Sequence, residues 1–398
     1  MNWSSALTRT TRIQQAAQRY IDRQEFAGIE WRVQVSGATL SEGRAGLGSP
    51  LTGEEIPDQA IYRIYSMTKP IVSVMALILV EQGMLNLFDP LAKFNPLFAR
   101  LQVLTSDGSL EPARRPVTVE DLLTHRSGFS YEFITGCHIA AGYDAAKLSS
   151  DGSCSLDDMM TKLAAQPLAF QPGSQFRYSV STDALAHVIE KATGKPLQAL
   201  LKQNIFEPLG MRDTDFYVDE TQRHRIMPMF GIEDISSLIT LTPPSQQKLN
   251  AIEVDHMYPC NDTSFRRGGH GLFSTLDDYC RFASMLLTGA TASGEKILSR
   301  KMHEMMLKNR IPPEQLPLKI GIAPLPGYGW GLGLRVMLDT GKAMGLTGED
   351  ECGWSGAAST YFWVDPVENM TGVVLSQYLG SMLPLADTMR TAAYQMLE

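Results

Sequence analysis

The sequence predicts an α+β fold: an antiparallel sheet flanked by N- and C-terminal helices, with a mainly helical domain inserted between the two parts of the sheet. Helix and strand patterns lead the chain, helical spacing dominates its middle, and strand patterns return before a last helix. The chain has 398 residues, more than one core usually organises. We therefore expect a discontinuous sheet domain, residues 1–94 and 271–398, a helical domain, residues 95–270, and a functional site at their interface.

Near the N-terminus, the spacing of apolar residues changes from helical to strand-like. Ile13 and Tyr20 belong to a helical stripe within residues 13–21. From Ile29 to Val35, apolar and polar residues alternate, as in an antiparallel strand with one buried face. Residues 1–21 also have the arginine-rich, acid-free composition of a transit peptide. We favour a structural helix, because the stripe offers an apolar face for the fold to bury.

The middle of the chain carries mostly helix signals. Thr118 and Asp121 resemble a capping box, and Gly128 suits the position that follows a helix. Further helical spacing covers residues 182–192, 196–206 and the segment from Ser274 to Gly289.

Strand patterns return in the last third of the chain, before a final amphipathic helix. We expect strands at residues 332–336, 357–364 and 370–377, and then a helix with Leu385, Met389, Ala393 and Met396 on one face.

Composition limits the classes of partner. The formal net charge is −8 and the pI is near 5.5, which argues against a nucleic-acid partner. The five cysteines form no C-x-x-C pair, so we expect reduced, mostly buried thiols. The sequence has neither a signal-peptide pattern nor an apolar run long enough to span a membrane. We expect a cytoplasmic protein that does not act at a membrane, and the sequence leaves the oligomeric state open.

Several common motifs are absent from the sequence. It has no G-x-S-x-G nucleophile elbow, no G-x-G-x-x-G, no Walker A sequence and no H-E-x-x-H. His187 and Glu190 have helical spacing but no further metal ligands arranged around them. We therefore expect neither a metal nor an organic cofactor.

The spacing S-x-x-K occurs three times, and context favours one of the three pairs. Ser245 and Ser293 lie in polar or small-residue loops, whereas Ser66 follows a strand-like segment and precedes the apolar helix 70–80. A serine needs a nearby base to become a nucleophile, and Lys69 lies on the same helical face. Burial would lower the pKa of this lysine toward neutrality. The alternative is a helix-capping serine beside a surface lysine.

Two more segments have features of an active site. Tyr178 lies on a loop that leads into a helix, although a tyrosine there often only packs the loop. The run from Gly353 to Ala358 is rich in small residues and leads into a strand, so a substrate could approach the backbone as an oxyanion hole requires. The alternative for this run is a bulge or close sheet packing.

The ordered set Ser66-Met67-Thr68-Lys69, Tyr178-Ser179-Val180 and Trp354-Ser355-Gly356 resembles the family VIII carboxylesterases. These enzymes belong to the serine β-lactamase and penicillin-binding-protein superfamily, with the class C β-lactamases as their nearest branch. Further stretches resemble the same family: residues 116–128, 206–214 and 268–287. The resemblance implies a sheet sandwich of β-lactamase type and covers nearly the whole chain.

The resemblance also implies roles for individual residues. Ser66 would be acylated, Lys69 and Tyr178 would move the proton, and the backbone N–H groups of Ser66 and Ala357 would form the oxyanion hole. Trp354 stands where class C β-lactamases have the lysine of K-T-G, and Val180 stands where they have an asparagine. We expect Trp354 to offer an apolar wall and Val180 to offer no hydrogen bond, so efficient β-lactam hydrolysis is not expected. The substrate-binding residues expected are Trp354, Ser355, Gly356, Val180, Phe129 and Tyr131.

The expected function is that of a serine carboxylesterase, which hydrolyses short-to-medium acyl esters through a Ser66 acyl-enzyme. Weak hydrolysis of some β-lactams is compatible with the same site. The alternatives are an acyltransferase or transesterase, a β-lactamase or D-alanyl peptidase on the same fold, and a catalytically silent binding protein of penicillin-recognising type. The partner expected is a small-molecule ester.

Overall fold

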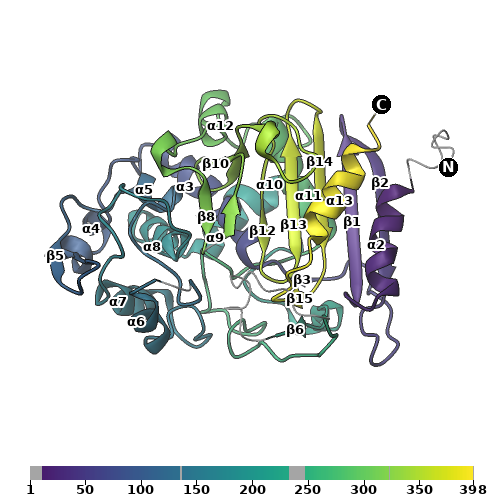
Figure 1. Cartoon of the computed structure of the whole chain (residues 1–398), viewed down its shortest axis with the longest axis horizontal. Helices are drawn as coiled ribbons and strands as arrows, with labels where there is room; N and C mark the ends of the chain where they lie inside the picture. The colour runs from purple at the N-terminus through teal and green to yellow at the C-terminus, as the bar shows by residue number, and fades with distance from the viewer. Residues whose placement is uncertain (1–10, 135–136, 233–246, 322, 398) are drawn as a thin grey trace.

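A computed structural model describes residues 11–134, 137–232, 247–321 and 323–397. Its centre is a seven-stranded antiparallel sheet in the order β10-β11-β12-β13-β14-β1-β2 (Figure 1). The two ends of the chain meet where β1 pairs with β14, with Glu30 opposite Leu375. The strands of this sheet are β1 Gly28–Val35, β2 Ala38–Gly46, β10 Tyr328–Trp330, β11 Arg335–Met337, β12 Cys352–Gly356, β13 Thr360–Asp365 and β14 Met370–Leu375.

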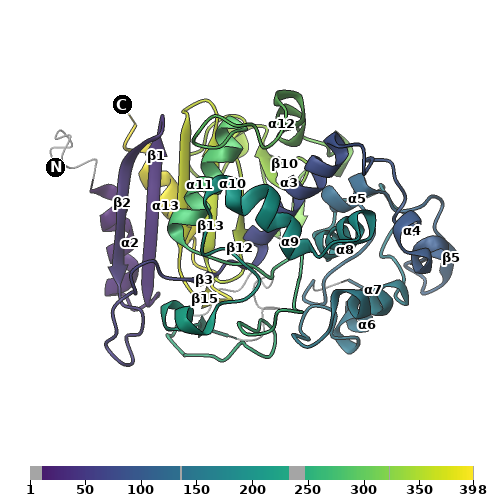
Figure 2. The ribbon, with the colours of Figure 1, turned by 180° about the vertical axis from the view of Figure 1, so that it is seen from behind.

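Helices cover both faces of the sheet. The terminal helices α2 (Arg12–Asp22) and α13 (Leu385–Tyr394) pack on one face, and α11 (Leu276–Thr288) packs on the other (Figures 1 and 2). Because β13 is covered on both sides, it is buried along its whole length: Trp363 lies in the core with the terminal helices and Phe362 in the core with α11. The fold class that the sequence predicts is confirmed.

The helical region lies beside the sheet, and α3 (Thr68–Glu81) runs into it. α3 is buried from Thr68 to Leu79 and packs against α8 (Ser181–Thr193). This position brings the start of α3 close to both regions of the molecule. The other α-helices in the described ranges are α4 Leu91–Phe94, α5 Val119–Leu123, α6 Ala140–Ala145, α7 Leu156–Ala164, α9 Leu197–Leu201, α10 Glu207–Leu209 and α12 Arg300–Met306.

Short strand pairs connect these regions. They are β3 Tyr62–Arg63 with β7 Phe273–Ser274, β4 Gln102–Leu104 with β5 Leu110–Pro112, β6 Phe230–Gly231 with β15 Tyr378–Leu379, and β8 Leu318–Ile320 with β9 Ala323–Leu325. The boundary between the two predicted domains stays a prediction, because one continuous hydrophobic core includes α3, α8 and the strand residue Phe362.

Most of the expected elements form, with four differences. Residues 352–356 form strand β12, which the sequence did not predict because the small residues of this segment have a low β-propensity. Helix α5 has the expected capping box but ends at Leu123, several residues before Gly128. The backbone φ angle is positive at His125 as well as at Gly128. The expected helix 196–206 becomes a π-helical turn after Leu201. Strand β11 begins only at Arg335, after Gly333, whose φ is +104°.

Two further observations concern composition. All five cysteines lie among the described residues, and each is buried and unpaired, as expected. In the described ranges, no helix combines the length and the apolar character that crossing a membrane requires. Of the N-terminal segment considered as a transit peptide, residues 1–10 lie outside the described residues, and α2 buries Ile13, Ala17 and Tyr20 in the sheet domain.

Candidate active site

Ser66 lies in a tight turn between β3 and α3. The preceding residue, Tyr65, has a φ of +43°, which is unfavourable for a large side chain. The turn then continues as a 3-10 helix, Tyr65–Met67, directly into α3. This geometry presents Ser66 to a cavity at the N-terminal end of the helix, where the positive end of the helix dipole lies. Strain concentrated beside a polar side chain is a frequent feature of functional sites.

Lys69 lies one turn beyond Ser66 and is completely buried. Its ammonium nitrogen, Nζ, lies 3.0 Å from Ser66 Oγ and donates a hydrogen bond to the Gly269 carbonyl at 2.7 Å. Burial lowers the pKa of Lys69 to about 7, and the carboxylate of Asp183 acts in the opposite direction. A large fraction of the Lys69 side chains is therefore neutral near pH 7, and a neutral amine can accept the proton of the Ser66 hydroxyl.

Asp183 and Gly269 hold the carbonyl that binds Lys69. Asp183, in the first turn of α8, is buried, and its Oδ1 accepts a hydrogen bond of 2.9 Å from the Gly269 N–H. A Cβ atom at position 269 would lie 2.5 Å from Asp183 Oδ2, so the close approach of these two segments requires glycine. This contact fixes the Gly269 backbone and, through its carbonyl, the position of the Lys69 amine.

Tyr178 lies beside the same amine. The centre of its ring is 4.6 Å from Lys69 Nζ, and its phenol oxygen accepts a hydrogen bond of 3.0 Å from Trp354 Nε1. Burial raises the pKa of Tyr178, whereas hydrogen bonds with Ser66 and Trp354 act in the opposite direction. The phenol therefore stays protonated at neutral pH. The phenol group therefore interacts with both the Trp354 indole and the Ser66 hydroxyl.

Trp354 is almost completely buried: its side chain is 5% exposed and is not among the residues that line the cavity, so its expected role as an apolar wall stays a prediction. It lies on β12 and holds Tyr178 through its indole N–H, while its ring packs edge-on against Trp330. The sequence shows that tryptophan replaces the lysine of K-T-G at position 354, but it does not show the hydrogen bond from this tryptophan to Tyr178.

Ala357 is the residue that the resemblance implies as the second oxyanion-hole donor, and this role stays a prediction. It follows β12 directly, and it lines the same cavity as Ser66. The preceding residue, Gly356, allows this arrangement, because a Cβ atom there would lie 2.4 Å from the Ile64 carbonyl. The end of β12 therefore packs tightly against the turn that carries Ser66, as an oxyanion hole built from both backbones requires.

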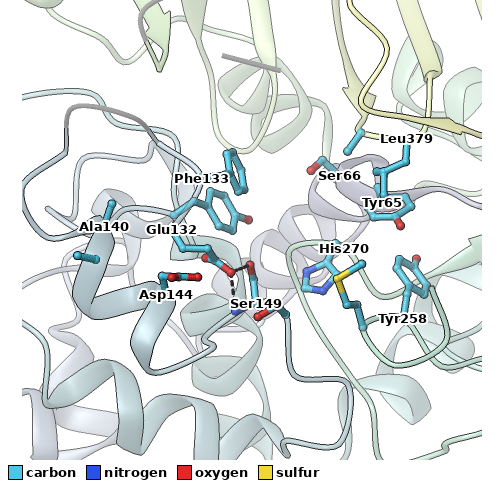
Figure 3. A pocket seen from close by; sticks show the side chains of 15 residues that line it. Tyr65, Ser66, Glu132, Phe133, Ala140, Asp144, Ser149, Tyr258, His270 and Leu379 are labelled. Atoms are coloured by element: carbon cyan, nitrogen blue, oxygen red, sulfur yellow. Dashed lines mark hydrogen bonds between the residues drawn. The ribbon is translucent and has the colours of Figure 1, made fainter. Parts of the chain in front are cut away.

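The cavity has a volume of about 570 Å³ and opens between the helical region and the sheet (Figure 3). Of the expected substrate-binding residues, Tyr131 lines it. Phe129 and Val180 do not, because both are completely buried in the core, where Phe129 packs edge-on against Phe98. Ser355 and Gly356 also lie outside the cavity lining, next to Ala357. The cavity is lined by Tyr65, Ser66, Tyr131, Glu132, Phe133, Ala140, Ala141, Asp144, Ser149, Ser150, Met257, Tyr258, His270, Ala357 and Leu379.

Sequence reasoning missed several residues of this site. Asp183 follows Tyr178 by five positions, and Gly269 stands in the stretch Gly268-Gly269-His270-Gly271, so both lie in segments that the motifs had marked. No local pattern shows that these two segments touch. Within the described ranges, no group of three or more His, Cys, Asp or Glu side chains is placed to hold a metal ion.

A serine at the start of a buried helix, next to a buried lysine and a tyrosine on this sheet scaffold, defines a serine hydrolase. The chain belongs to the beta-lactamase family, whose model, described as "Beta-lactamase", matches residues 13–395. The resemblance to the family VIII carboxylesterases, predicted from the motifs, is confirmed by the relatives and by the fold.

Three similar proteins illustrate this relationship. Protein Rv1367c of Mycobacterium tuberculosis (strain ATCC 25618 / H37Rv) is 33% identical over 82% of this chain and 79% of its own length. Esterase EstB of Burkholderia gladioli is 29% identical over 90% of this chain and 88% of its own length. The solved structure of "EstCE1, a hydrolase with promiscuous acyltransferase activity" has a TM-score of 0.81 at 23% identity and covers 98% of this chain and 99% of its own.

Proposed function

We propose that this protein is a serine carboxylesterase that hydrolyses short-to-medium acyl esters through an acyl-enzyme on Ser66. The observation that carries the proposal is the hydrogen bond of 3.0 Å between Ser66 and Lys69, a lysine whose pKa is lowered to about 7, at one end of a cavity of about 570 Å³. The volume falls in the range of small-molecule sites. The similarity to Esterase EstB supports the choice of an ester as substrate.

In the acylation step, Ser66 Oγ attacks the ester carbonyl carbon while its proton passes to the neutral amine of Lys69. The backbone N–H groups of Ser66 and Ala357 bind the oxygen that becomes negatively charged. Tyr178 donates its proton to the departing alkoxide oxygen and regains a proton from the Lys69 ammonium. One C–O bond forms to Ser66, one C–O bond breaks to the alcohol, and the enzyme returns to its initial protonation state.

In the deacylation step, water attacks the acyl carbon from the cavity. Lys69 and Tyr178 take up the proton of the water and return one to Ser66 Oγ as the acyl–oxygen bond breaks, which releases the carboxylic acid. Every step needs one hydroxyl, one amine and one phenol within reach of the same carbon atom. The hydrogen bond from Trp354 and the packing over Lys69 keep the phenol in that position.

An alcohol in place of water would make the protein an acyltransferase. This second function is supported by the similarity to EstCE1, which is described as a hydrolase with promiscuous acyltransferase activity. Partitioning of the acyl group between water and an added alcohol measures the balance of the two reactions. A β-lactam substrate is less favoured, because an indole replaces the lysine of K-T-G at position 354 and so provides no cation for the carboxylate of the β-lactam.

The proposal includes a reducing compartment, the cytoplasm, as the site of action. Five unpaired thiols among the described residues support it, since oxidising compartments favour disulfides.

The test is hydrolysis of a series of p-nitrophenyl esters by wild type and by Ser66→Ala. Ser66→Ala is expected to lose about a thousandfold or more in kcat and to form no acyl adduct in intact-mass spectra. Ser293→Ala is a matched control, because Ser293 begins another S-x-x-K sequence but is exposed in a loop. Equal hydrolysis by wild type and Ser66→Ala would contradict the proposal.

A further inference from the structure

The cavity has two chemically different ends. Ser66 lies at one end, and the carboxylates of Glu132 and Asp144 lie on the opposite side (Figure 3). Asp144 is exposed on α6, whereas Glu132 is only partly exposed. Among the described residues that line the cavity, these two are the only acidic ones, and none is a lysine or an arginine.

Glu132 is held in a fixed position with one oxygen free. Its Oε1 accepts hydrogen bonds from the backbone N–H of Ser149, at 3.2 Å, and from the Ser149 hydroxyl. Its other oxygen, Oε2, is buried and has no hydrogen-bond partner in the described part of the chain. Burial raises the pKa of Glu132, and Asp144 contributes in the same direction. A positive charge in the cavity would stabilise the anionic form of Glu132 and offset the repulsion between the two carboxylates.

Two aromatic residues that flank Glu132 in the sequence also line the cavity. The rings of Tyr131 and Phe133 are stacked with centres 4.7 Å apart, and both residues line the cavity. Carboxylates and aromatic rings that line one cavity are a combination suited to organic cations, since a ring face attracts a cation without a strong hydration cost. The same pair of carboxylates repels a substrate that carries a carboxylate of its own.

We propose that the cavity selects esters that carry a cationic amine or quaternary ammonium group, with Glu132 and Asp144 as the residues that determine this specificity. The inference rests on the proposed esterase function and names its substrate class. The ester carbonyl lies at Ser66, and the cation lies on the side of Phe133 and the two carboxylates. Neutral esters are substrates of the same site but lack this attraction.

Two pairs of esters with the same shape and different charge test the inference. One pair places the charge in the acyl part, as the p-nitrophenyl esters of 4-(trimethylammonio)butanoate and 5,5-dimethylhexanoate. The other pair places it in the alcohol part, as acetylcholine and 3,3-dimethylbutyl acetate. In wild type we expect kcat/KM to be about tenfold higher for the cationic member of at least one pair. This ratio is expected to fall as ionic strength rises, because salt screens the attraction.

Variants then assign the preference to the two carboxylates. Glu132→Gln is expected to lower the cation-to-neutral ratio by about threefold or more, and Asp144→Asn to lower it by a smaller factor. Asp144 is exposed, so Asp144→Asn gives a result even where Glu132→Gln disturbs folding. The control Glu349→Gln removes an exposed carboxylate outside the cavity lining and is expected to leave the ratio unchanged.

The outcomes separate the inference from the proposed function. Hydrolysis of neutral esters with no preference for the cationic member of either pair would overturn the inference and leave the esterase function intact. A preference that persists unchanged in both Glu132→Gln and Asp144→Asn would also overturn it. No hydrolysis of any ester and no acyl adduct on Ser66 would overturn both.

Discussion

Lys69 and the two arginines Arg335 and Arg390 are buried to a similar degree but have very different surroundings. Lys69 is 0% exposed, and Arg335 and Arg390 are 8% and 2% exposed. Both arginines bind the carboxylate of Glu351 at 3.3 Å and donate to the phenol of Tyr361. Burial lowers the pKa of both guanidinium groups, but the neighbouring phenols and Glu351 outweigh it, and the net shift is upward.

Lys69 has no carboxylate within ion-pair distance among the described residues. Its hydrogen-bond partners are the Ser66 hydroxyl and the Gly269 carbonyl, and the rings of Tyr131 and Tyr178 lie beside it. Burial therefore dominates and lowers the pKa of Lys69 to about 7. One fold thus buries cations in two ways: with anionic partners where the charge stabilises structure, and without them where a neutral base is needed.

The largest expected effect comes from replacing Lys69. Lys69→Met is expected to lower kcat by about a thousandfold, because Ser66 then has no amine to accept its proton. The same variant is expected to unfold at a higher temperature. The unfolded lysine has a pKa near 10.5, so below about pH 7 the folded state pays the full cost of a buried charge, and this cost disappears as the pH rises toward 10.5.

Activity and thermal unfolding measured from pH 6 to about pH 10 check this prediction. The rise in unfolding temperature is expected to be largest at the acidic end. A Lys69→Met protein that is less stable than wild type at pH 6 would show that Lys69 is a structural cation like the two arginines.

The next largest effect is expected from removing the carboxylate that the two buried arginines share. Glu351→Gln leaves Arg335 and Arg390 without their shared carboxylate, so we expect the free energy of unfolding in urea to fall by about 3–5 kcal/mol. Activity per folded molecule is expected to stay the same, because Glu351 does not line the cavity. An unchanged free energy of unfolding would contradict the structural role of this cluster.

A smaller effect is expected from Trp354→Phe. This change keeps an aromatic ring but removes the N–H that binds the Tyr178 phenol, and we expect kcat/KM to fall about tenfold. Trp330→Phe is the matched control, because the Trp330 indole donates to the Leu123 carbonyl instead. Steady-state kinetics on p-nitrophenyl esters measure both variants. Equal losses of kcat/KM in the two variants would mean that Trp354 acts only through packing.

Much of this fold could be predicted from the sequence, since its helices and strands carry strong local patterns. Alternation from Ile29 to Val35 marks β1, and the apolar run after Lys69 marks α3. The three motif segments also identify the groups that meet at the site. The strand at residues 352–356 was missed because glycine and serine carry little β-propensity, and only pairing with β11 and β13 makes it a strand.

The rest depends on contacts between distant segments. The contact of Asp183 with Gly269 and that of Trp354 with Tyr178 join residues 86 and 176 positions apart. Phe129 was expected in the substrate site with no motif behind it, and its side chain is buried in the core and does not line the cavity. Local patterns place a residue on an element and do not show which neighbour it meets in the folded protein.

The most direct test of the central claim, a neutral Lys69 that activates Ser66, is the rate of Ser66 acylation as a function of pH. Rapid mixing with p-nitrophenyl acetate measures this rate as the burst of p-nitrophenol released before turnover. We predict that the rate rises with pH as the Lys69 ammonium loses its proton, with a midpoint at about pH 7 and a plateau above it. A rate that does not change across this range, or a midpoint near the ordinary lysine value of 10.5, would contradict the account.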